Sequence, residues 1–385
     1  MVSRLTHLPD TVLARYRPLA PTAAVRVSPL ALGAMNFGTK QSDKLGECTK
    51  ETAFAIMDHY YAKGGNFIDT ANNYQLGQSE EWVGDWLASR GNRDDIVLAT
   101  KYSSAYMLHE KQRLQANYGG NNVKSMKHSL ELSLRRLQTS YIDLFYLHWW
   151  DYSTSIPEIM HALNDLVVSG KVHYLGISDT PAWVVSKANQ YARSAGLRQF
   201  VVYQGNWNAA QRDFERDIIP MCMNEGMGLC PWGVLNAGRF QTAAGFAQRE
   251  KDNPGRQNQV SDRDRQVSGV LEKVADAKHV SLLDVALAYV RHKAPYVVPL
   301  VGGRTVEHIE GNVNGLGTEL TAEDMREIEA AYNFDPGFPH TFLSGTLLSG
   351  EQPKGAYGPA DIWLTRLMGN FEWVESSKPI SPEIV

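Results

Sequence analysis

Four polar side chains in the first 150 residues carry groups that suit the reduction of a carbonyl. They are Asp69, Tyr74, Lys101 and His148. A phenol, with an ordinary pKa near 10, is a poor acid at neutral pH, but a nearby ammonium group stabilises its phenolate form. Lys101 would therefore lower the pKa of Tyr74 and make it a better proton donor, while Asp69 would keep Lys101 charged and oriented. His148 can hydrogen-bond a substrate carbonyl and set its angle.

Each of these residues taken singly also has an ordinary structural explanation. Asp69 can cap a helix, and Lys101 can be a solvated lysine at a strand end. Tyr74 can pack on the rim of a loop, and His148 can be a hydrogen-bonded core residue. Their joint occurrence favours chemistry, because polar groups at the same end of three consecutive strands need partners. No side chain donates hydride, so the reaction also requires a nicotinamide.

The elements that must position these residues are short apolar runs that alternate with segments of helical period. Eight runs predict strands at Leu30–Leu32, Asn66–Asp69, Ile96–Thr100, Ile142–Leu147, Val172–Ile177, Phe200–Gln204, Gly228–Pro231 and Val297–Leu300. Helices are predicted at Glu51–Lys63, Glu80–Ser89, Val123–Leu137, Pro157–Val168, Pro181–Arg193, Asp213–Asn224 and Thr321–Tyr332, with two more in Val267–Lys293. The strand runs are continuous rather than alternating, which is typical of parallel strands buried on both faces.

Eight such strands favour an α/β fold of the (β/α)8 TIM-barrel type. The alternative, an open doubly wound sheet, predicts a G-x-G-x-x-G fingerprint after the first strand, and the sequence from Gly33 to Gly38 does not match it. In a barrel the carboxyl ends of the strands meet at one mouth. Asp69, Lys101 and His148 would converge there, with Tyr74 in the loop that follows Asp69.

The chain is predicted to form a single domain with long active-site loops. Residues 1–337 would form the barrel, with its core at about 25–335, and 338–385 would be a C-terminal extension that packs on the barrel near the substrate mouth. Two polar stretches, Tyr102–Asn122 and Arg239–Gln266, do not fit the strand–helix alternation. Loops of this length are usually functional or mobile.

Composition narrows the class of protein. The 385 residues contain 38 basic and 42 acidic side chains, and a net charge of −4 argues against nucleic-acid binding. No apolar run reaches the roughly 18 residues of a membrane span, and no secretory signal is evident. Cys48, Cys222 and Cys230 are too scattered for a disulfide framework or a thiolate zinc site. The sequence therefore predicts a cytoplasmic enzyme that has no metal and acts on a small molecule.

Over roughly Val25 to Tyr332, the sequence resembles the aldo-keto reductase superfamily. Seven motifs in order carry the resemblance: FIDTANNY (67–74), ATK (99–101), YLHWW (146–150), LGISDTPAW (175–183), VVYQGNWN (201–208), CPWGVLNAGRF (230–240) and VPLVGGRTVEHIEGN (298–312). The chain length, the Trp149-Trp150 pair and the CPWG turn most resemble the fungal aryl-alcohol dehydrogenase and norsolorinic acid reductase branch. The resemblance implies that the family's catalytic tetrad maps onto Asp69, Tyr74, Lys101 and His148.

The same resemblance implies a binding site for NADP(H). Ser178, Asp179 and Gln204 match residues that hold the nicotinamide carboxamide, and Trp232 matches the aromatic residue that stacks on the nicotinamide ring. The loop that crosses the pyrophosphate is matched by Leu235, Gly238 and Arg239. The segment that binds the adenosine phosphate and adenine is matched by Gly302, Gly303, Arg304, His308 and Asn312.

Two positions depart from the family pattern. The family usually has asparagine after the serine, and an ionised Asp179 can only accept hydrogen bonds, which predicts weaker or reoriented nicotinamide binding. The basic residue common early in the adenosine-phosphate segment is absent from Val301-Gly-Gly303. Arg304 is then the candidate for the 2′-phosphate, because a guanidinium can fork onto phosphate, and NADP(H) is the expected cofactor.

Aromatic residues near the predicted mouth favour an aromatic substrate; they are Tyr106, Trp149, Trp150 and Trp207. The expected activity is an NADPH-dependent interconversion of an aromatic or polyketide-derived aldehyde or ketone and its alcohol, in secondary metabolism. Three alternatives stay open. The barrel can be a nicotinamide-binding regulatory subunit, or it can be recruited for a dehydration or isomerisation. A carboxylate hydrolase would instead need two facing acidic groups at the mouth.

Overall fold

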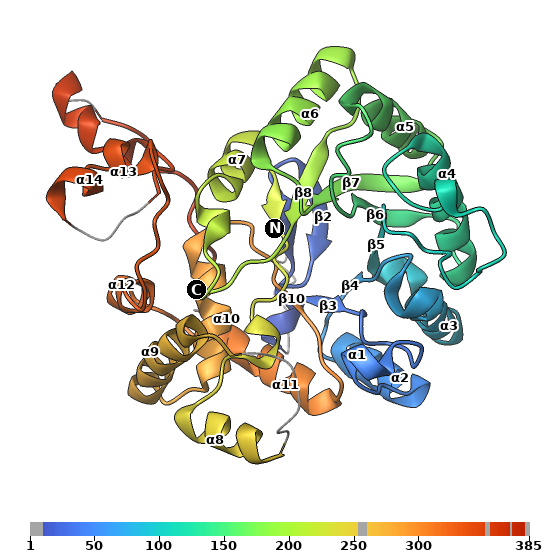
Figure 1. Ribbon diagram of the computed structural model, residues 1–385, viewed down its shortest axis with the longest axis horizontal. Coiled ribbons are helices and arrows are strands. Elements are labelled where there is room, and N and C mark those ends of the chain that lie inside the picture. Colours follow the sequence, from blue (N-terminus) through green and yellow to red (C-terminus); the bar gives the residue numbers. More distant parts are fainter. Residues whose placement is uncertain (1–10, 253–259, 351–354, 370–371, 382–385) are drawn as a thin grey trace, which may run out of the picture.

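The computed structural model describes residues 11–252, 260–350, 355–369 and 372–381, and Figure 1 shows its helices surrounding a central set of strands. Eight strands form one parallel sheet in the order β10-β3-β4-β5-β6-β7-β8-β9. They are β3 (Ala31–Gly33), β4 (Phe67–Asp69), β5 (Val97–Tyr102), β6 (Ile142–Leu147), β7 (Val172–Ser178), β8 (Phe200–Gln204), β9 (Gly228–Leu229) and β10 (Leu300–Val301). Backbone N–H groups of Val298 and Leu300 donate to the carbonyls of Leu229 and Pro231, which closes the sheet. The predicted (β/α)8 barrel is confirmed.

Many of the helices around the barrel begin at residues whose side chains cap them. The larger helices are α2 (Lys50–Ala62), α3 (Gln78–Arg90), α4 (Val123–Arg136), α5 (Ile156–Val168), α6 (Ala182–Ala195), α7 (Ile218–Glu225), α8 (Ala243–Asp252), α9 (Asp262–Lys278), α10 (Leu282–Lys293), α11 (Val306–Asn314) and α12 (Ala322–Glu329). Ser281 and Asp284 form a capping box, which separates α9 from α10 as expected. Helix α8 lies in a stretch predicted to be a loop, and α11 was not predicted. Within the described residues, no helix is both long and apolar enough to cross a membrane.

The last two barrel strands are shorter than predicted, and β10 begins later than predicted. The predicted run Val297–Leu300 gives β10 only at Leu300–Val301, while Val297 forms an isolated parallel bridge with Leu229. The predicted run Gly228–Pro231 gives β9 only at Gly228–Leu229. Pro231 and Pro299 stand in these segments, and proline has no N–H to donate to a ladder. The two strands are therefore held by few hydrogen bonds.

An antiparallel hairpin that was not predicted closes the amino-terminal end of the barrel. It consists of β1 (Arg17–Ala20) and β2 (Ala23–Val27). Leu19 and Val27 are fully buried in one cluster with barrel-interior side chains such as Leu144. Thr22 donates a 2.7 Å hydrogen bond to the carbonyl of Gly226, just before β9. The opposite end, where the strands finish, is left for the site.

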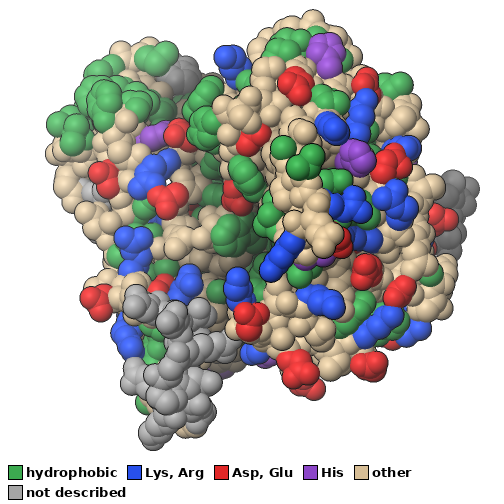
Figure 2. Space-filling model, turned by 45° about the vertical axis from the view of Figure 1, so that its right-hand side comes forward, with side chains coloured by type: hydrophobic (Ala, Val, Ile, Leu, Met, Phe, Trp, Pro, Cys, Tyr) green, Lys and Arg blue, Asp and Glu red, His purple; other side chains and the backbone are tan. Residues whose placement is uncertain are grey.

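The C-terminal extension projects from the side of the barrel (Figure 1). It contains α13 (His340–Leu343), α14 (Thr346–Ser349) and two 3-10 turns, Pro359–Asp361 and Trp363–Met368. Phe338, Leu347 and Leu348 are exposed on it, and Figure 2 shows hydrophobic side chains gathered at the upper left, where this projection lies. The guanidinium of Arg216 donates to the carbonyl of Asp335 and so ties the start of the extension to the barrel.

The close fit of the hairpin predicts a stability effect at Gly228. A Cβ added there would lie 2.3 Å from the carbonyl oxygen of Leu19, so Gly228→Ala should reduce the free energy of unfolding by about 1–3 kcal/mol. Gly269→Ala is the matched control, because this exposed glycine lies inside α9 with nothing within 4 Å of the added atom. It should stabilise the protein by roughly 0.5–1 kcal/mol. Urea unfolding of both variants measures these changes. An unchanged free energy of unfolding in Gly228→Ala would contradict the prediction.

Candidate active site

The ends of the barrel strands bring three of the four predicted catalytic groups into contact. Asp69 is the last residue of β4, Lys101 lies in β5, and Tyr74 lies in the turn after β4. The Lys101 ammonium donates to the Asp69 carboxylate, to the carbonyl of Thr70 at 2.8 Å and to the Tyr74 hydroxyl at 3.3 Å. All three donors of the ammonium group are therefore directed at oxygen atoms.

A side chain from the opposite side of the barrel completes the environment of Asp69. The Gln204 amide, at the end of β8, donates to the second carboxylate oxygen of Asp69 at 2.9 Å. Asp69 and Lys101 are 1% and 0% exposed, so both charges have lost their water. Such a pair is stable only when its remaining hydrogen bonds are satisfied. Because Asp69 faces a lysine rather than a second acid, this pair is not the two-carboxylate arrangement of a glycoside hydrolase.

The pKa of Tyr74 differs from the expectation. Burial raises it above its ordinary value, and Lys101, which acts in the opposite direction, offsets this only in part. Spacing in the sequence indicated the effect of the lysine but not the loss of water around the phenol. Burial also lowers the pKa of Lys101, but Asp69 and Tyr74 raise it to above its usual range. Near neutral pH, the site therefore contains a protonated lysine beside a neutral phenol.

His148 follows β6 directly and meets the Tyr74 ring edge-on, with ring centroids 5.8 Å apart. Burial, and then the charge of Lys101, lowers its pKa to about 3, so the imidazole is neutral at physiological pH. Its Nδ1 atom is buried and has no hydrogen-bond partner in the described part of the chain. Buried polar atoms without partners are rare in folded proteins, and this one can serve a bound molecule.

The predicted nicotinamide residues lie beside this group. Ser178 ends β7, and its hydroxyl donates to the Asp179 carboxylate at 3.4 Å. The backbone N–H of Asp179 donates to the carbonyl of Gln204 at 3.1 Å, and Asp179 has a left-handed φ of 39°. Non-glycine residues seldom adopt this conformation, which is concentrated at functional sites. Trp232, 38% exposed, presents an aromatic ring to solvent nearby and hydrogen-bonds Asp179.

Asp179 keeps its proton to a higher pH than an ordinary carboxyl group does. Loss of hydration raises its pKa to about 6, although hydrogen bonds from Trp232 and Ser178 and the charge of Lys101 oppose the shift. A protonated carboxyl group can both donate and accept, as an amide does. The predicted mismatch with a carboxamide therefore applies to the ionised form of Asp179, not to its protonated form.

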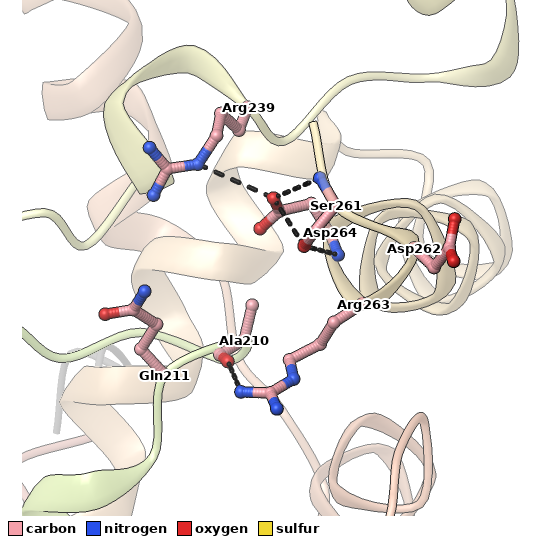
Figure 3. Close-up of a pocket in the computed structure, with 7 residues that line it drawn as sticks. All are labelled: Ala210, Gln211, Arg239, Ser261, Asp262, Arg263 and Asp264. Carbon is pink, nitrogen blue, oxygen red and sulfur yellow. Dashed lines mark hydrogen bonds and ion pairs between the residues drawn. The ribbon is translucent and has the colours of Figure 1, made fainter. Parts of the chain in front are cut away.

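Arg239 lies on the wall of a cavity of about 530 Å³ (Figure 3). Its guanidinium points toward Asp264, at 3.6 Å, and donates to the side chain of Asn236. Burial opposes ionisation of Asp264, but hydrogen bonds from Ser261 and Asn236 and the charge of Arg239 lower its pKa. Leu235 and Gly238, the other predicted members of this loop, flank and end the turn Asn236–Gly238 beside it. The charge of Arg239 is therefore largely balanced within the protein.

The predicted adenosine-phosphate segment joins β10 to α11. Gly302 and Gly303 follow the strand, and the backbone N–H of Arg304 donates to Nδ1 of His308 at 3.3 Å. Asn312 is buried in α11. Arg304 forms no ion pair with any residue that the structure describes. Arg239, by contrast, lies 3.6 Å from Asp264.

The four aromatic residues predicted for the substrate pocket differ in accessibility. Trp149 is 40% exposed, and its indole donates to the Ser104 hydroxyl at 3.1 Å. Trp150 is partly buried against the main core, and Tyr106 is 3% exposed. Trp207 is fully buried and stacks on Phe214, with centroids 5.6 Å apart, so the structure places it in the core. Its position after a strand did not reveal which way its side chain points.

A second group of polar residues, not identified from the sequence, holds the segment between β4 and α3. Arg136 donates to the carbonyl of Asn72 at 2.9 Å and to the Glu80 carboxylate at 3.2 Å. Thr100, next to Lys101, donates to Glu80 at 2.7 Å. Glu80 lies in an ordinary helical pattern, so the sequence did not indicate that its side chain is fully buried.

Comparison with known proteins agrees with this geometry. The model of the aldo/keto reductase family matches residues 29–333, and the chain belongs to that family. It is an oxidoreductase that acts on carbonyl or alcohol groups. It is 66% identical to norsolorinic acid reductase B of Dothistroma septosporum over 98% of this chain and 96% of that protein. It is 63% identical to norsolorinic acid reductase B of Aspergillus parasiticus over 97% of this chain and 98% of that protein. It is 49% identical to an aryl-alcohol dehydrogenase [NADP(+)] of Phanerodontia chrysosporium over 86% of this chain and 89% of that protein.

The raised pKa of Asp179 predicts a pH-dependent difference in stability. Because the folded state holds this proton more tightly than the unfolded state, Asp179 weakens folding as the pH rises from about 4 through 6. Asp179→Asn removes the effect, so its free energy of unfolding relative to the unmodified protein should rise over that range. Since Asp179 keeps contact with solvent, we expect a change of about 1 kcal/mol. Urea titrations at several pH values measure this, and a pH-independent difference would refute it.

Proposed function

We propose that the protein uses NADPH to reduce an aromatic or polyketide-derived aldehyde or ketone in secondary metabolism, with Tyr74 as the proton donor. The observation that carries the proposal is the hydrogen bonding of one buried ammonium group, Lys101, to both Asp69 and Tyr74. The names of the similar proteins, norsolorinic acid reductase and aryl-alcohol dehydrogenase, support this substrate class.

The side chains divide the reaction among them. Bound nicotinamide supplies the hydride, because no side chain can. The neutral phenol of Tyr74 gives its proton to the carbonyl oxygen as that oxygen gains electrons, and Lys101 stabilises the phenolate left behind. Asp69, which accepts a hydrogen bond from Gln204, holds Lys101 in place. The neutral His148 hydrogen-bonds the substrate oxygen and orients it. In the reverse direction the phenolate accepts the proton of an alcohol.

The residues around the mouth fit a nicotinamide dinucleotide. The exposed ring of Trp232 offers a surface for stacking, and Ser178 and Asp179 offer hydrogen-bonding groups beside it. Arg304, which has no acidic partner in the described part of the chain, offers its charge to a phosphate. A further phosphate ester on the ribose is what separates NADPH from NADH. These features, and the NADP(+) in one relative's name, support NADPH as the cofactor.

The central test is Tyr74→Phe. It removes one hydroxyl and keeps the ring, so packing should survive. General acid catalysis is typically worth 10²–10⁴-fold, so we expect reduction of aromatic aldehydes to slow at least about a hundredfold. NADPH binding, followed by fluorescence, should remain close to normal.

Lys101→Met is a less clean companion variant. It should also be slow, but it leaves the Asp69 charge buried without its partner, which typically costs 3–5 kcal/mol of stability. Full activity of Tyr74→Phe on a good substrate would show that another group donates the proton. If the unmodified protein binds NADPH but reduces no carbonyl compound in a broad screen, the reductase proposal is wrong.

The assignment of Arg304 makes a separate prediction about cofactor choice. Arg304→Ala should weaken NADPH binding by about 1.5–3 kcal/mol, or roughly tenfold to a hundredfold, because a charge-assisted hydrogen bond is lost. NADH binding should hardly change. Arg239→Ala is the matched control, because a group on the shared pyrophosphate should affect both cofactors alike. Calorimetric titration with each cofactor measures these affinities. If Arg304→Ala weakens NADPH and NADH binding equally, Arg304 does not bind the 2′-phosphate.

A further inference from the structure

Tyr74 begins a backbone turn that L-amino acids rarely adopt. The turn covers Tyr74–Gly77, and Gln75, Leu76 and Gly77 have φ angles of 52°, 58° and 98°. Only the last of these is a glycine. Left-handed conformations in successive non-glycine residues are unfavourable, and they persist only where the surrounding structure imposes them. The position of the Tyr74 ring therefore depends on whatever holds this turn.

A reciprocal pair of glutamine side chains holds it. The backbone N–H of Gln41 donates to the Gln75 side-chain oxygen at 2.7 Å, and the backbone N–H of Gln75 donates to the Gln41 side-chain oxygen at 3.2 Å. The Gln75 amide nitrogen also donates to the carbonyl of Met35 at 3.4 Å. Gln75 is 0% exposed, so these bonds do not compete with water. Each glutamine thus satisfies the backbone of the other.

The loop that carries Gln41 is shaped to fit against the turn. At Gly38, φ is 151° and an added Cβ would lie 2.5 Å from side-chain carbons of Gln75, so only glycine leaves room. The backbone N–H of Thr39 donates to the side chain of Gln78 at 2.7 Å. An antiparallel bridge between Gly38 and Cys48 closes the base of the loop.

We propose that Gln75 and Gln41 act as positioning residues for Tyr74. Their paired hydrogen bonds fix the left-handed turn and thereby keep the Tyr74 hydroxyl 3.3 Å from the Lys101 ammonium. This inference rests on the proposed role of Tyr74 as proton donor. If the pair is lost, the phenol moves away from the lysine more of the time. Its proton is then transferred more slowly, although the cofactor site is intact.

The test uses two variants that act on opposite sides of the pair. Gln41→Ala removes the partly exposed partner, and Gln75→Asn shortens the buried one while keeping a residue that tolerates positive φ. Each should reduce kcat for aldehyde reduction about tenfold or more and leave the Kd for NADPH within about twofold. The alkaline limb of the kcat profile should move to higher pH, because the phenol loses stabilisation by Lys101. The double variant should be no more than about twofold slower than the slower single variant, since both variants disrupt the same reciprocal pair of hydrogen bonds.

Gln78→Ala is the matched control, because it removes another hydrogen bond to the same loop without touching the glutamine pair. Its kcat should stay within about twofold of the unmodified protein. Lower melting temperatures with unchanged kcat and pH profile, or an equal loss in Gln78→Ala, would overturn the proposal. Hydrogen exchange of the amides at 74–78 gives a readout that needs no activity, and it should be faster in Gln41→Ala. Hydrogen exchange also separates this inference from the proposed function. Even if the protein reduces no carbonyl compound, unchanged exchange would refute the positioning role of the glutamine pair.

Discussion

The buried pair of Asp69 and Lys101 constrains the rest of the barrel mouth. Bringing two such charges out of water costs several kcal/mol for each ion, so the pair requires partners in fixed places. These partners are the carbonyl of Thr70, the amide of Gln204 and the hydroxyl of Tyr74. They come from the residue that follows β4, from the end of β8 and from the turn after β4, and the closed sheet brings these segments together. The hydrogen bonding of the charge pair therefore depends in part on closure of the barrel, which brings Gln204 to Asp69.

The electrostatic character of the site follows from how each charge is partnered. Lys101 keeps its proton because Asp69 and Tyr74 together outweigh the effect of burial, and the same lysine helps to keep His148 neutral. Away from this centre, Arg239 is held by Asp264, whereas Arg304 has no acidic partner in the described ranges. Within the described residues, the charges inside the site are thus balanced, and Arg304 at its edge has no acidic partner. This distribution suits a ligand that is neutral at its reacting end and anionic at the other.

Much of the fold and of the site could be predicted from the sequence, because strands buried on both faces give continuous apolar runs and polar residues at their ends are conspicuous. Asp69, Lys101 and His148 could be placed in this way. Other features depend on information that spacing does not contain. The β1–β2 hairpin has no glycine turn, and Trp207 could point either way. The raised pKa of Tyr74 depends on burial, and the importance of Gln75 depends on a positive φ.

The hairpin at the amino-terminal end places the residues that matter for folding at the opposite end of the barrel from the site. Leu19 and Val27 fill that end together with the strand interiors, so changes there affect whether the protein folds. Exposed residues such as Trp149 lie in loops at the other end, and changes in barrel loops of this kind generally have little effect on the core. A duplicated copy of the gene can therefore acquire a different substrate by changes in loops alone. A barrel that is sealed at one end can keep its core unchanged while the loops at the other end vary.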